Sequence, residues 1–261
     1  HLYRIGYKVF LLDGTTVVPD TMISRDTNSA LLRKTVMGDS LFAFWREYNP
    51  VYYAARSLED GSEVTPATYL FTTNTVWPFI RTSPDSLGRL HVQYNDGNHV
   101  VYAVWTPAPG SGFITEYEWV IPDAYGCGVL LVDGNRVHVV VKDDYYHTYE
   151  YLQYDLEGNL VVPQRDFTVD DITTSQFPEL SLDSDRNLMI VDAIYTLSSP
   201  EQYRYVLWKL DGATGETIVD EKELVVGIPP IMVVSPGFIL RALPGSEEFY
   251  LCWNDGGESL W

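Results

Sequence analysis

The chain has 261 residues, of which 46% are hydrophobic and 14% aromatic, a composition typical of a folded globular protein rather than a disordered one. Its 36 acidic and 17 basic residues give a formal net charge of −19, and such a field repels nucleic acid and anionic membrane surfaces. No stretch approaches the roughly 18 consecutive apolar residues of a membrane span, so we expect neither a nucleic-acid partner nor membrane insertion.

Five short apolar runs recur along the chain, and an acidic or amide residue follows each of them closely. They occupy residues 41–45, 90–94, 137–141, 188–191 and 249–253, so that successive runs begin 49, 47, 51 and 61 residues apart. Aromatic and β-branched side chains are frequent in them, as expected for strands. Each run is predicted to be the second strand of a repeated unit, and no sustained helical periodicity competes with this pattern.

A hairpin turn follows a further strand in each unit. The turns contain Asp13-Gly14, Asp60-Gly61, Gly110-Ser111-Gly112, Glu157-Gly158 and Asp211-Gly212. Asp-Gly and related pairs favour turns with positive φ that close tight hairpins. A period of about 50 residues with about four strands in each unit is typical of the blades of a β-propeller.

The two ends of the chain each carry half a unit. Residues 2–10 and 16–23 are predicted to be third and fourth strands, and residues 237–243 and 249–253 first and second strands. Pairing these halves completes one blade and removes the exposed edges of an open ring.

The sequence therefore predicts an all-β fold. It is a five-bladed β-propeller of four-stranded blades, closed by the N-terminal strands joining the C-terminal blade, as a single domain over residues 1–261. The blades are predicted at 29–75, 76–124, 125–173, 174–225, and 226–261 together with 1–28. A six-bladed propeller is the alternative, because residues 225–236 add length before the last unit.

Two segments carry a recurring aspartate pattern, Ser83-Pro84-Asp85-Ser86-Leu87-Gly88 and Ser181-Leu182-Asp183-Ser184-Asp185. The pattern resembles the Asp box of the sialidase-like β-propellers, which carry bacterial neuraminidase repeats. Gly88 stands one place later than the glycine of that motif, and Asp185 occupies the glycine position. The resemblance implies a propeller fold and a family that includes glycosidases and many secreted, non-catalytic binding domains.

The segment Tyr3-Arg4-Ile5-Gly6 resembles the arginine motif near the start of sialidases, with Gly6 in place of the proline. A sialidase needs three arginines around the substrate carboxylate, and a tyrosine nucleophile that a glutamate activates. The other arginines of this chain do not recur at matching positions in the units. The resemblance therefore implies a degenerate, non-catalytic member, and we assign no catalytic residue.

The loops that link the second and third strands are predicted to lie on one rim of the propeller. They carry Glu47, Tyr48, Asn95, Asp96, Asp143, Asp144, Asp192, Tyr195, Asn254 and Asp255. Sugars are bound by such groups, because hydroxyls donate to carboxylates and amides while the sugar ring stacks on an aromatic side chain. We expect a secreted, non-catalytic binding or structural protein that recognises a glycan or a protein on this rim. Ordinary turn formation is the alternative explanation of each residue.

Two other functions are alternatives. A glycoside hydrolase would place two carboxylates about 5–5.5 Å or about 6.5–9.5 Å apart, and Asp96, Asp144 and Asp192 are its first candidates because their positions match. A subunit of an extracellular assembly would use exposed tyrosine and tryptophan near the chain ends for self-association. The chain begins with His1 rather than methionine, so we expect a processed mature form or a fragment. The resemblance to often secreted propellers implies an extracellular location.

Asp183, Asp185 and Asn187 have the spacing of the start of a calcium loop. Leu188 and Ile194 stand where an EF-hand has glycine and a bidentate glutamate, so the match ends there. The three residues are the candidate ligands for Ca²⁺, and no other cofactor is expected.

Two pairs of residues are expected to serve packing. Cys127 and Cys252 form no CxxC motif, and we expect two buried free thiols. His91 and His138 are each the second residue of a second strand in neighbouring units, where packing or a place at the rim explains them.

Overall fold

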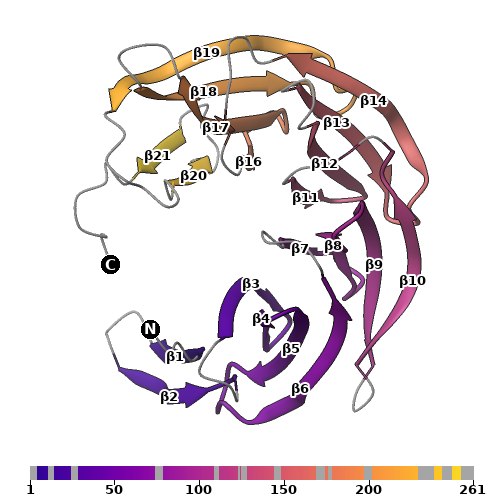
Figure 1. Cartoon of the computed structure of the whole chain (residues 1–261), viewed down its shortest axis with the longest axis vertical. Coiled ribbons are helices and arrows are strands. Elements are labelled where there is room, and N and C mark those ends of the chain that lie inside the picture. The colour runs from indigo at the N-terminus through magenta and orange to yellow at the C-terminus, as the bar shows by residue number, and fades with distance from the viewer. Residues whose placement is uncertain are drawn as a thin grey trace. The chain divides into compact units, whose positions relative to one another are not determined.

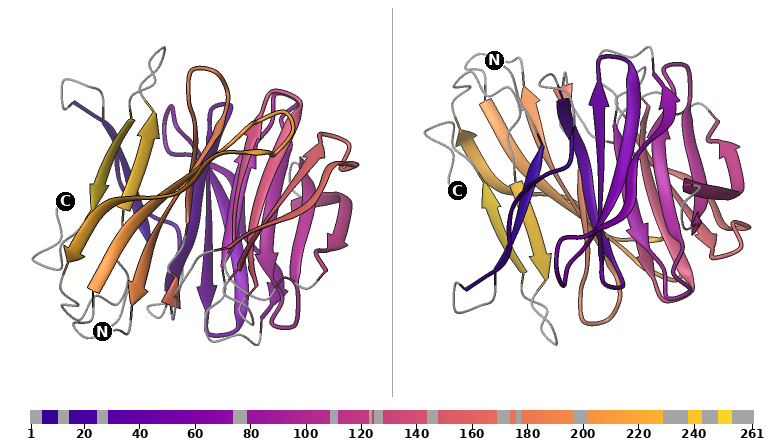
Figure 2. Two further views of the ribbon diagram at one scale, coloured as in Figure 1. Left: turned by 90° about the horizontal axis from the view of Figure 1, so that it is seen from above. Right: turned by 90° about the horizontal axis from the view of Figure 1, so that it is seen from below.

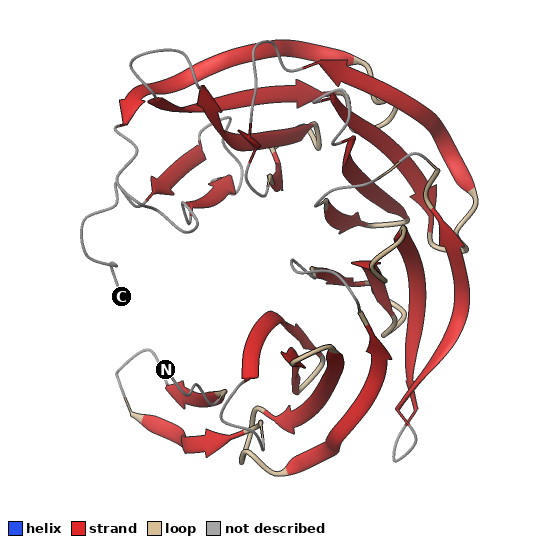
Figure 3. Ribbon diagram, viewed as in Figure 1, coloured by secondary structure: helices blue, strands red, loops and turns tan. Residues whose placement is uncertain are grey.

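The structure, a computed structural model, describes residues 5–10, 15–24, 29–73, 79–108, 112–122, 124, 128–143, 148–168, 174–175, 178–196, 202–228, 238–242 and 249–253. Every regular element in these ranges is a β-strand (Figure 3). The predicted all-β class is therefore confirmed. Within the same ranges, no helix has the length and apolar character needed to cross a membrane.

The chain divides into two compact units. The first comprises His1–Pro122 with Val132–Asn135 and Leu156–Gly158, and the second comprises Asp123–Leu131, Arg136–Asp155 and Asn159–Trp261. In each unit the strands form antiparallel sheets in which neighbours run in opposite directions (Figure 2).

The first unit contains one hairpin and two four-stranded sheets, in which strands pair in the order of the chain (Figure 1). The hairpin is β1 (Gly6–Phe10) and β2 (Thr16–Met22). The first sheet is β3 (Ser29–Met37), β4 (Ser40–Glu47), β5 (Pro50–Ser57) and β6 (Glu63–Thr72). The second sheet is β7 (Ile80–Pro84), β8 (Leu90–Asn95), β9 (Val100–Ala108) and β10 (Gly112–Val120).

The second unit is built on two further sheets and another hairpin. One sheet is β11 (Val129–Asp133), β12 (Arg136–Asp143), β13 (Thr148–Asp155) and β14 (Leu160–Thr168). The other is β16 (Glu179–Leu182), β17 (Leu188–Thr196), β18 (Gln202–Leu210) and β19 (Thr217–Ile228), with the two-residue β15 (Thr174–Ser175) also pairing with β17. The hairpin is β20 (Phe238–Ala242) and β21 (Phe249–Trp253). Four successive sheets with the same four-strand order are the repeat expected of propeller blades.

The apolar run in β4 is continuous because both faces of this strand are buried. Successive side chains of a strand point to opposite faces. Phe42 and Phe44 join a core with β7–β10, whereas Ala43 and Trp45 pack with Ile23 and other residues of the N-terminal segment. Trp45 is buried on this second face. The side chains of this second strand therefore alternate between two apolar surroundings, one on each face of the sheet. Such burial on both faces is expected where sheets pack on both sides of a strand.

The second unit has a core of the same kind. Residues of β12, β13 and β14 pack against residues of β16, β17 and β18, around the fully buried Trp208. The members are Val129, Val140, Tyr149, Tyr151, Val162, Leu180, Leu188, Ile190, Val206, Trp208 and Leu210.

The outer strand pair of each sheet differs from the pair inside it. The pairs β5–β6, β9–β10, β13–β14 and β18–β19 all contain register shifts. The pairs β4–β5, β8–β9, β12–β13 and β17–β18 have unbroken register. Bulges increase the twist of an edge strand and make it a poorer template for pairing with another chain.

Candidate functional site

The first unit brings two of the predicted rim turns to a common end of its packed sheets. Glu47 and Asn95 are the last residues of β4 and β8, and Tyr48 and Asp96 follow them in the turns β4–β5 and β8–β9. The ring of Phe71, opposite Val51 at the start of β5, lies 4.6 Å from the ring of Tyr94 near the end of β8. This contact joins the ends of the two sheets from which the turns project. We name these four turn residues the turn surface.

Tyr48 is the residue of the turn surface with the most unusual geometry. Its φ is 59°, in the left-handed region, and its side chain is 68% exposed. A bulky residue seldom adopts this conformation, which costs of order 1–2 kcal/mol in an L-amino acid. The preceding Glu47 is oriented by the indole of Trp45, whose Nε1 donates to Glu47 Oε1 at 2.8 Å. A strained, exposed aromatic residue beside a fixed carboxylate is a candidate ligand contact.

A row of aromatic rings crosses the sheet next to this turn. Trp45 and Tyr52 stack with centroids 6.0 Å apart, and Tyr52 meets Tyr69 edge-on at 6.1 Å. Tyr69 is 54% exposed, and its hydroxyl lies 3.1 Å from Thr72 Oγ1. The row therefore runs from the buried Trp45 to an aromatic surface on β6.

Asp96 closes the β8–β9 turn. Its Oδ1 accepts the backbone N–H groups of Asn98 and His99, both at 2.8 Å, and its Oδ2 lies 3.7 Å from His99 Nδ1. Burial alone would raise the pKa of Asp96, but these hydrogen bonds and the nearby His99 outweigh it and lower that pKa. Asp96 is thus an ionised carboxylate that caps a turn. This agrees with the alternative given above, in which the residue serves turn formation.

The prediction that Asp192 lies in a rim loop is wrong. Asp192 lies within β17, fully buried, and accepts a hydrogen bond from the Tyr149 hydroxyl. The Tyr149 ring meets Trp208 edge-on, with centroids 6.0 Å apart. The strand does not end at residue 191, because β17 continues to pair with β18 in unbroken register up to Thr196.

The remaining predicted rim residues are only partly described. Asp143 and Tyr195 have strand backbone, paired with Thr148 and Tyr203 respectively, and so lie at strand ends rather than in loops. Their side chains lie outside the described part of the chain. Also outside it are Asp144, Asn254, Asp255, Arg4 and Cys127, together with the side chain of Cys252.

The proposed calcium loop is a capped turn. Asp183 Oδ1 accepts the backbone N–H groups of Asp185 at 2.9 Å and Asn187 at 2.8 Å. Its Oδ2 accepts Asn187 Nδ2 at 3.0 Å and pairs with Lys209 Nζ at 2.7 Å. The carboxylate thus accepts three amide N–H groups and has a lysine as its cation, which is the arrangement of a capped turn. Across the described residues, no group of three or more His, Cys, Asp or Glu side chains is arranged to hold a metal ion.

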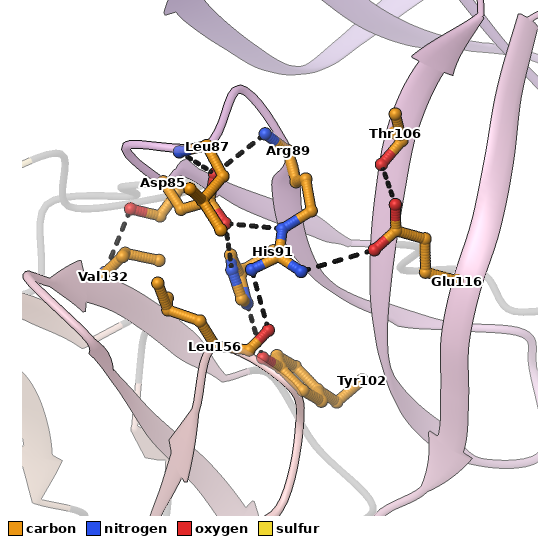
Figure 4. Close-up of polar contacts among 10 residues, drawn as sticks. Asp85, Leu87, Arg89, His91, Tyr102, Thr106, Glu116, Val132 and Leu156 are labelled. Carbon is orange, nitrogen blue, oxygen red and sulfur yellow. Dashed lines mark hydrogen bonds and ion pairs between the residues drawn. The ribbon is translucent and has the colours of Figure 1, made fainter.

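The first Asp-box-like segment forms a buried hydrogen-bond network (Figure 4). Asp85 Oδ1 accepts the backbone N–H groups of Leu87 and Arg89, at 2.9 and 2.8 Å. Asp85 Oδ2 accepts Arg89 Nε at 2.8 Å and lies 3.2 Å from His91 Nε2. His91 Nδ1 lies 2.6 Å from the Tyr102 hydroxyl. Because His91 and Tyr102 are fully buried, this Asp–His–Tyr series joins β7, β8 and β9 and does not face solvent.

Arg89 extends this network to two further segments of the first unit. Its Nη1 lies 3.3 Å from Glu116 Oε2 on β10, and its Nη2 donates to the carbonyl of Leu156 at 2.9 Å. Glu116 also accepts a hydrogen bond from the Thr106 hydroxyl. Arg89, Tyr102 and Glu116 were not predicted, although the close spacing of Asp85, Arg89 and His91 along the β7–β8 turn and the start of β8 was a usable signal.

The two repeated histidines serve packing. His91 and His138 are both fully buried, and His138 Nδ1 lies 2.8 Å from the Tyr151 hydroxyl, as His91 does from Tyr102. Burial lowers the pKa of His91 more than the neighbouring Asp85 raises it, so the ring is neutral at neutral pH. The sequence left two places open for these histidines, the packed interior and the rim. Both side chains lie in the interior.

No protein-family model matches this sequence, and no curated protein is significantly similar to it. Among solved structures, the periplasmic gluconolactonase PpgL of Pseudomonas aeruginosa is similar with a TM-score of 0.53 at 12% identity, covering 95% of this chain and 66% of that one. A protein of unknown function from Bacteroides caccae has a TM-score of 0.48 at 13% identity, covering 84% and 75%. The α-L-arabinofuranosidase PaAbf62A of Podospora anserina, solved with cellotriose, has a TM-score of 0.41 at 13% identity, covering 73% and 65%.

These comparisons define a class of fold. The chain is structurally similar to β-propeller proteins, in agreement with its repeated four-stranded sheets. It spans slightly less than two thirds of the length of the lactonase. At 12% identity the similarity extends to the fold and not to an activity.

Proposed function

We propose that this chain is a secreted, non-catalytic β-propeller that binds a glycan through the turn surface of its first unit. The observation that carries the proposal is the left-handed, 68% exposed Tyr48 beside Glu47. Strained residues cluster at binding sites, where the surrounding structure holds a side chain in a conformation that the backbone alone disfavours.

The chemistry of the turn surface suits a sugar. The ring of Tyr48 offers a face on which the C–H groups of a sugar can stack, and the carboxylate of Glu47 accepts hydroxyl hydrogens. The exposed ring of Tyr69 supplies a further stacking position on the adjoining strand β6. An extended glycan that contacts two or more of these groups fits this surface better than a compact molecule does.

The propeller in this proposal has five blades. The described strands form four sheets of common strand order and two separate hairpins, β1–β2 and β20–β21. If the two hairpins pair with each other, they form a fifth four-stranded blade. Such closure removes two exposed sheet edges. The degenerate Asp boxes support placing the chain near the sialidase-like propellers, with structural aspartates in place of a catalytic set.

A glycan array with and without Ca²⁺ tests the proposal. We expect the wild-type chain to bind a subset of glycans with or without the metal. Tyr48→Gly should abolish this binding and leave the protein folded, because glycine accepts the left-handed backbone more readily. Tyr117→Ala, which removes a 42% exposed ring on β10, is the matched control and should bind normally. A silent array for the wild type, or equal binding by the Tyr48 variant, would refute the proposal.

The competing functions predict other results on the same preparation. A glycoside hydrolase would release sugar from a bound glycan, but of its three first candidates Asp192 is buried and Asp96 caps a turn. A subunit of an extracellular assembly would elute as an oligomer in sizing. Recognition of a protein in place of a glycan would leave the array silent.

A further inference from the structure

A cavity in the second unit is lined by residues that the sequence did not single out. Its volume is about 420 Å³, within the range of about 300–1,000 Å³ typical of small-molecule sites. It lies where β13 and β14 face the end of β18 and the start of β19. The lining residues are Tyr151, Arg165, Asp166, Leu210, Gly215 and Thr217.

The floor of the cavity is rigid and uncharged. Tyr151 and Leu210 are buried in the core of the unit. The Tyr151 hydroxyl is held by His138 Nδ1 at 2.8 Å and by Gln153 Nε2 at 3.0 Å. Burial raises the pKa of Tyr151 to about 12, so the phenol carries no charge at neutral pH.

Gly215 shapes one wall of the cavity. Its φ is +70°, and a Cβ at this position would lie 2.5 Å from Tyr151 Cε1. The turn that contains Gly215 is anchored, because Arg136 Nη1 and Gln153 Nε2 both donate to the carbonyl of Gly212 at 2.8 Å. The absence of a side chain therefore lets backbone approach the aromatic floor at this wall.

Arg165 supplies the positive charge of the cavity. It pairs directly with Tyr151 across β13 and β14, so both side chains lie on the same face. The next residue, Asp166, pairs with Glu150 and also lines the cavity, so Arg165 is the positive charge of the lining beside one carboxylate. Among the described residues Arg165 forms no salt bridge, whereas Arg89 and Lys209 each pair with an aspartate.

We propose that this cavity binds a sugar acid, a hydroxylated carboxylate of monosaccharide size, through Arg165. A guanidinium holds a carboxylate with two parallel hydrogen bonds. The exposed Thr217 can bond a sugar hydroxyl beside the carboxylate that Arg165 holds. This site is independent of the turn surface, which belongs to the other unit.

Calorimetric titration of the full chain tests the proposal with four probes. We expect glucuronate to bind at least ten-fold more tightly than glucose, which lacks the carboxylate, and than acetate, which lacks the ring. Inorganic phosphate should also bind more weakly, because it lacks both the planar carboxylate and a sugar hydroxyl for Thr217. Glucose binding equal to glucuronate binding would overturn the proposal, as would equal binding of acetate or phosphate, or no binding of any probe.

Variants locate the ligand. Arg165→Gln should weaken glucuronate at least ten-fold, and Lys222→Gln, the same charge change at an exposed residue of β19, should not. Thr217→Val keeps the side-chain volume and should weaken glucuronate but not acetate. Tyr48→Gly should leave glucuronate binding intact, so that failure of the turn-surface proposal and failure of this one are distinguishable. Loss of glucuronate binding in Tyr48→Gly, or its retention in Arg165→Gln, would place the ligand elsewhere.

Discussion

The turn between β7 and β8 and the turn between β16 and β17 have the same backbone design in two different units. In each, the N–H of the first aspartate donates to the carbonyl four residues later, at 3.0 Å from Asp85 and 3.1 Å from Asp183. In each, the aspartate Oδ1 accepts the N–H of that same later residue at 2.8 Å. The residue before it is left-handed, with φ of 77° at Gly88 and 65° at Arg186.

The two turns differ in what their carboxylates reach. Asp85 bonds Arg89 and His91, and Arg89 continues to Glu116 and the Leu156 carbonyl. The charged partner of Asp183 is Lys209 on the strand β18. The lysine side chain is 22% exposed. The aspartate-capped turn is thus repeated as a unit while its surroundings diverge. The carboxylates of such turns are structural, whichever cation completes them.

The largest expected difference between the turns comes from removing the aspartates. Asp85→Ala leaves Arg89 and the buried His91 without their carboxylate, which we expect to cost about 3–5 kcal/mol. Asp183→Ala breaks a similar turn but frees a more exposed lysine, and we expect about 1–3 kcal/mol. Urea unfolding of both variants measures the difference, with Glu59→Ala in an exposed turn as control. Equal losses would mean that the extended contacts of Asp85 add no stability.

A third copy of the turn runs from Asp155 to Asn159. Comparing it with the Asp85 turn distinguishes the cost of left-handed backbone from the cost of a steric clash. Its left-handed residue is Gly158, and a Cβ there would lie 2.2 Å from Trp119 Cη2, whereas a Cβ on Gly88 meets nothing within 4 Å. Gly88→Ala should therefore cost about 1 kcal/mol for backbone strain alone. Gly158→Ala should cost about 2–4 kcal/mol, because overpacking is added. Thermal unfolding of the two variants decides this, and similar melting temperatures would contradict the placement of Trp119.

Much of the fold could be predicted from local patterns. The run at 41–45 lies inside β4, and the glycine of Asp60-Gly61 has the expected positive φ of 76°. Strand alternation and turn chemistry act over a few residues, so a sequence displays them directly. The same local signals predicted the four repeated sheets.

The candidate site was harder to predict because its contacts join distant residues. Asp192 is buried against Tyr149, 43 positions earlier, and Arg89 reaches Leu156, 67 positions later. In a sequence, a carboxylate that caps a turn looks the same as one that binds a ligand. The apolar run ends at residue 191, yet the strand continues, because pairing with β18 extends past the last apolar side chain. The strained backbone of Tyr48 had no local signal at all.

His91 distinguishes the Asp85 turn from the Asp183 turn in its response to pH. The pKa of His91 is lowered in the folded state, so the unfolded chain binds the proton more readily. The stabilisation is therefore complete above the ordinary histidine pKa of about 6.5, and it is lost as the pH falls below that value. We expect the melting temperature to fall between pH 7.5 and pH 5.

Two histidine variants assign this pH dependence. His91→Gln should flatten the decline, because it removes the titrating ring from the network. His99→Gln replaces an exposed histidine and should leave the decline as in the wild type. A flat melting temperature in the wild type, or an unchanged slope in His91→Gln, would contradict the neutral state of the buried ring.

The smallest expected effect concerns the left-handed position of the two turns, where the second turn has an arginine in place of glycine. Arg186 adopts a φ of 65° where the first turn has glycine, and left-handed backbone costs of order 1–2 kcal/mol in an L-residue. Arg186→Gly and Arg186→Ala both remove the contacts of the arginine side chain, but only glycine relieves the backbone. Glycine should therefore be the more stable variant by about 1 kcal/mol in urea unfolding. If the alanine variant were equally stable, the second turn would not hold this residue left-handed in solution, and the shared design of the two turns would end at the aspartate cap.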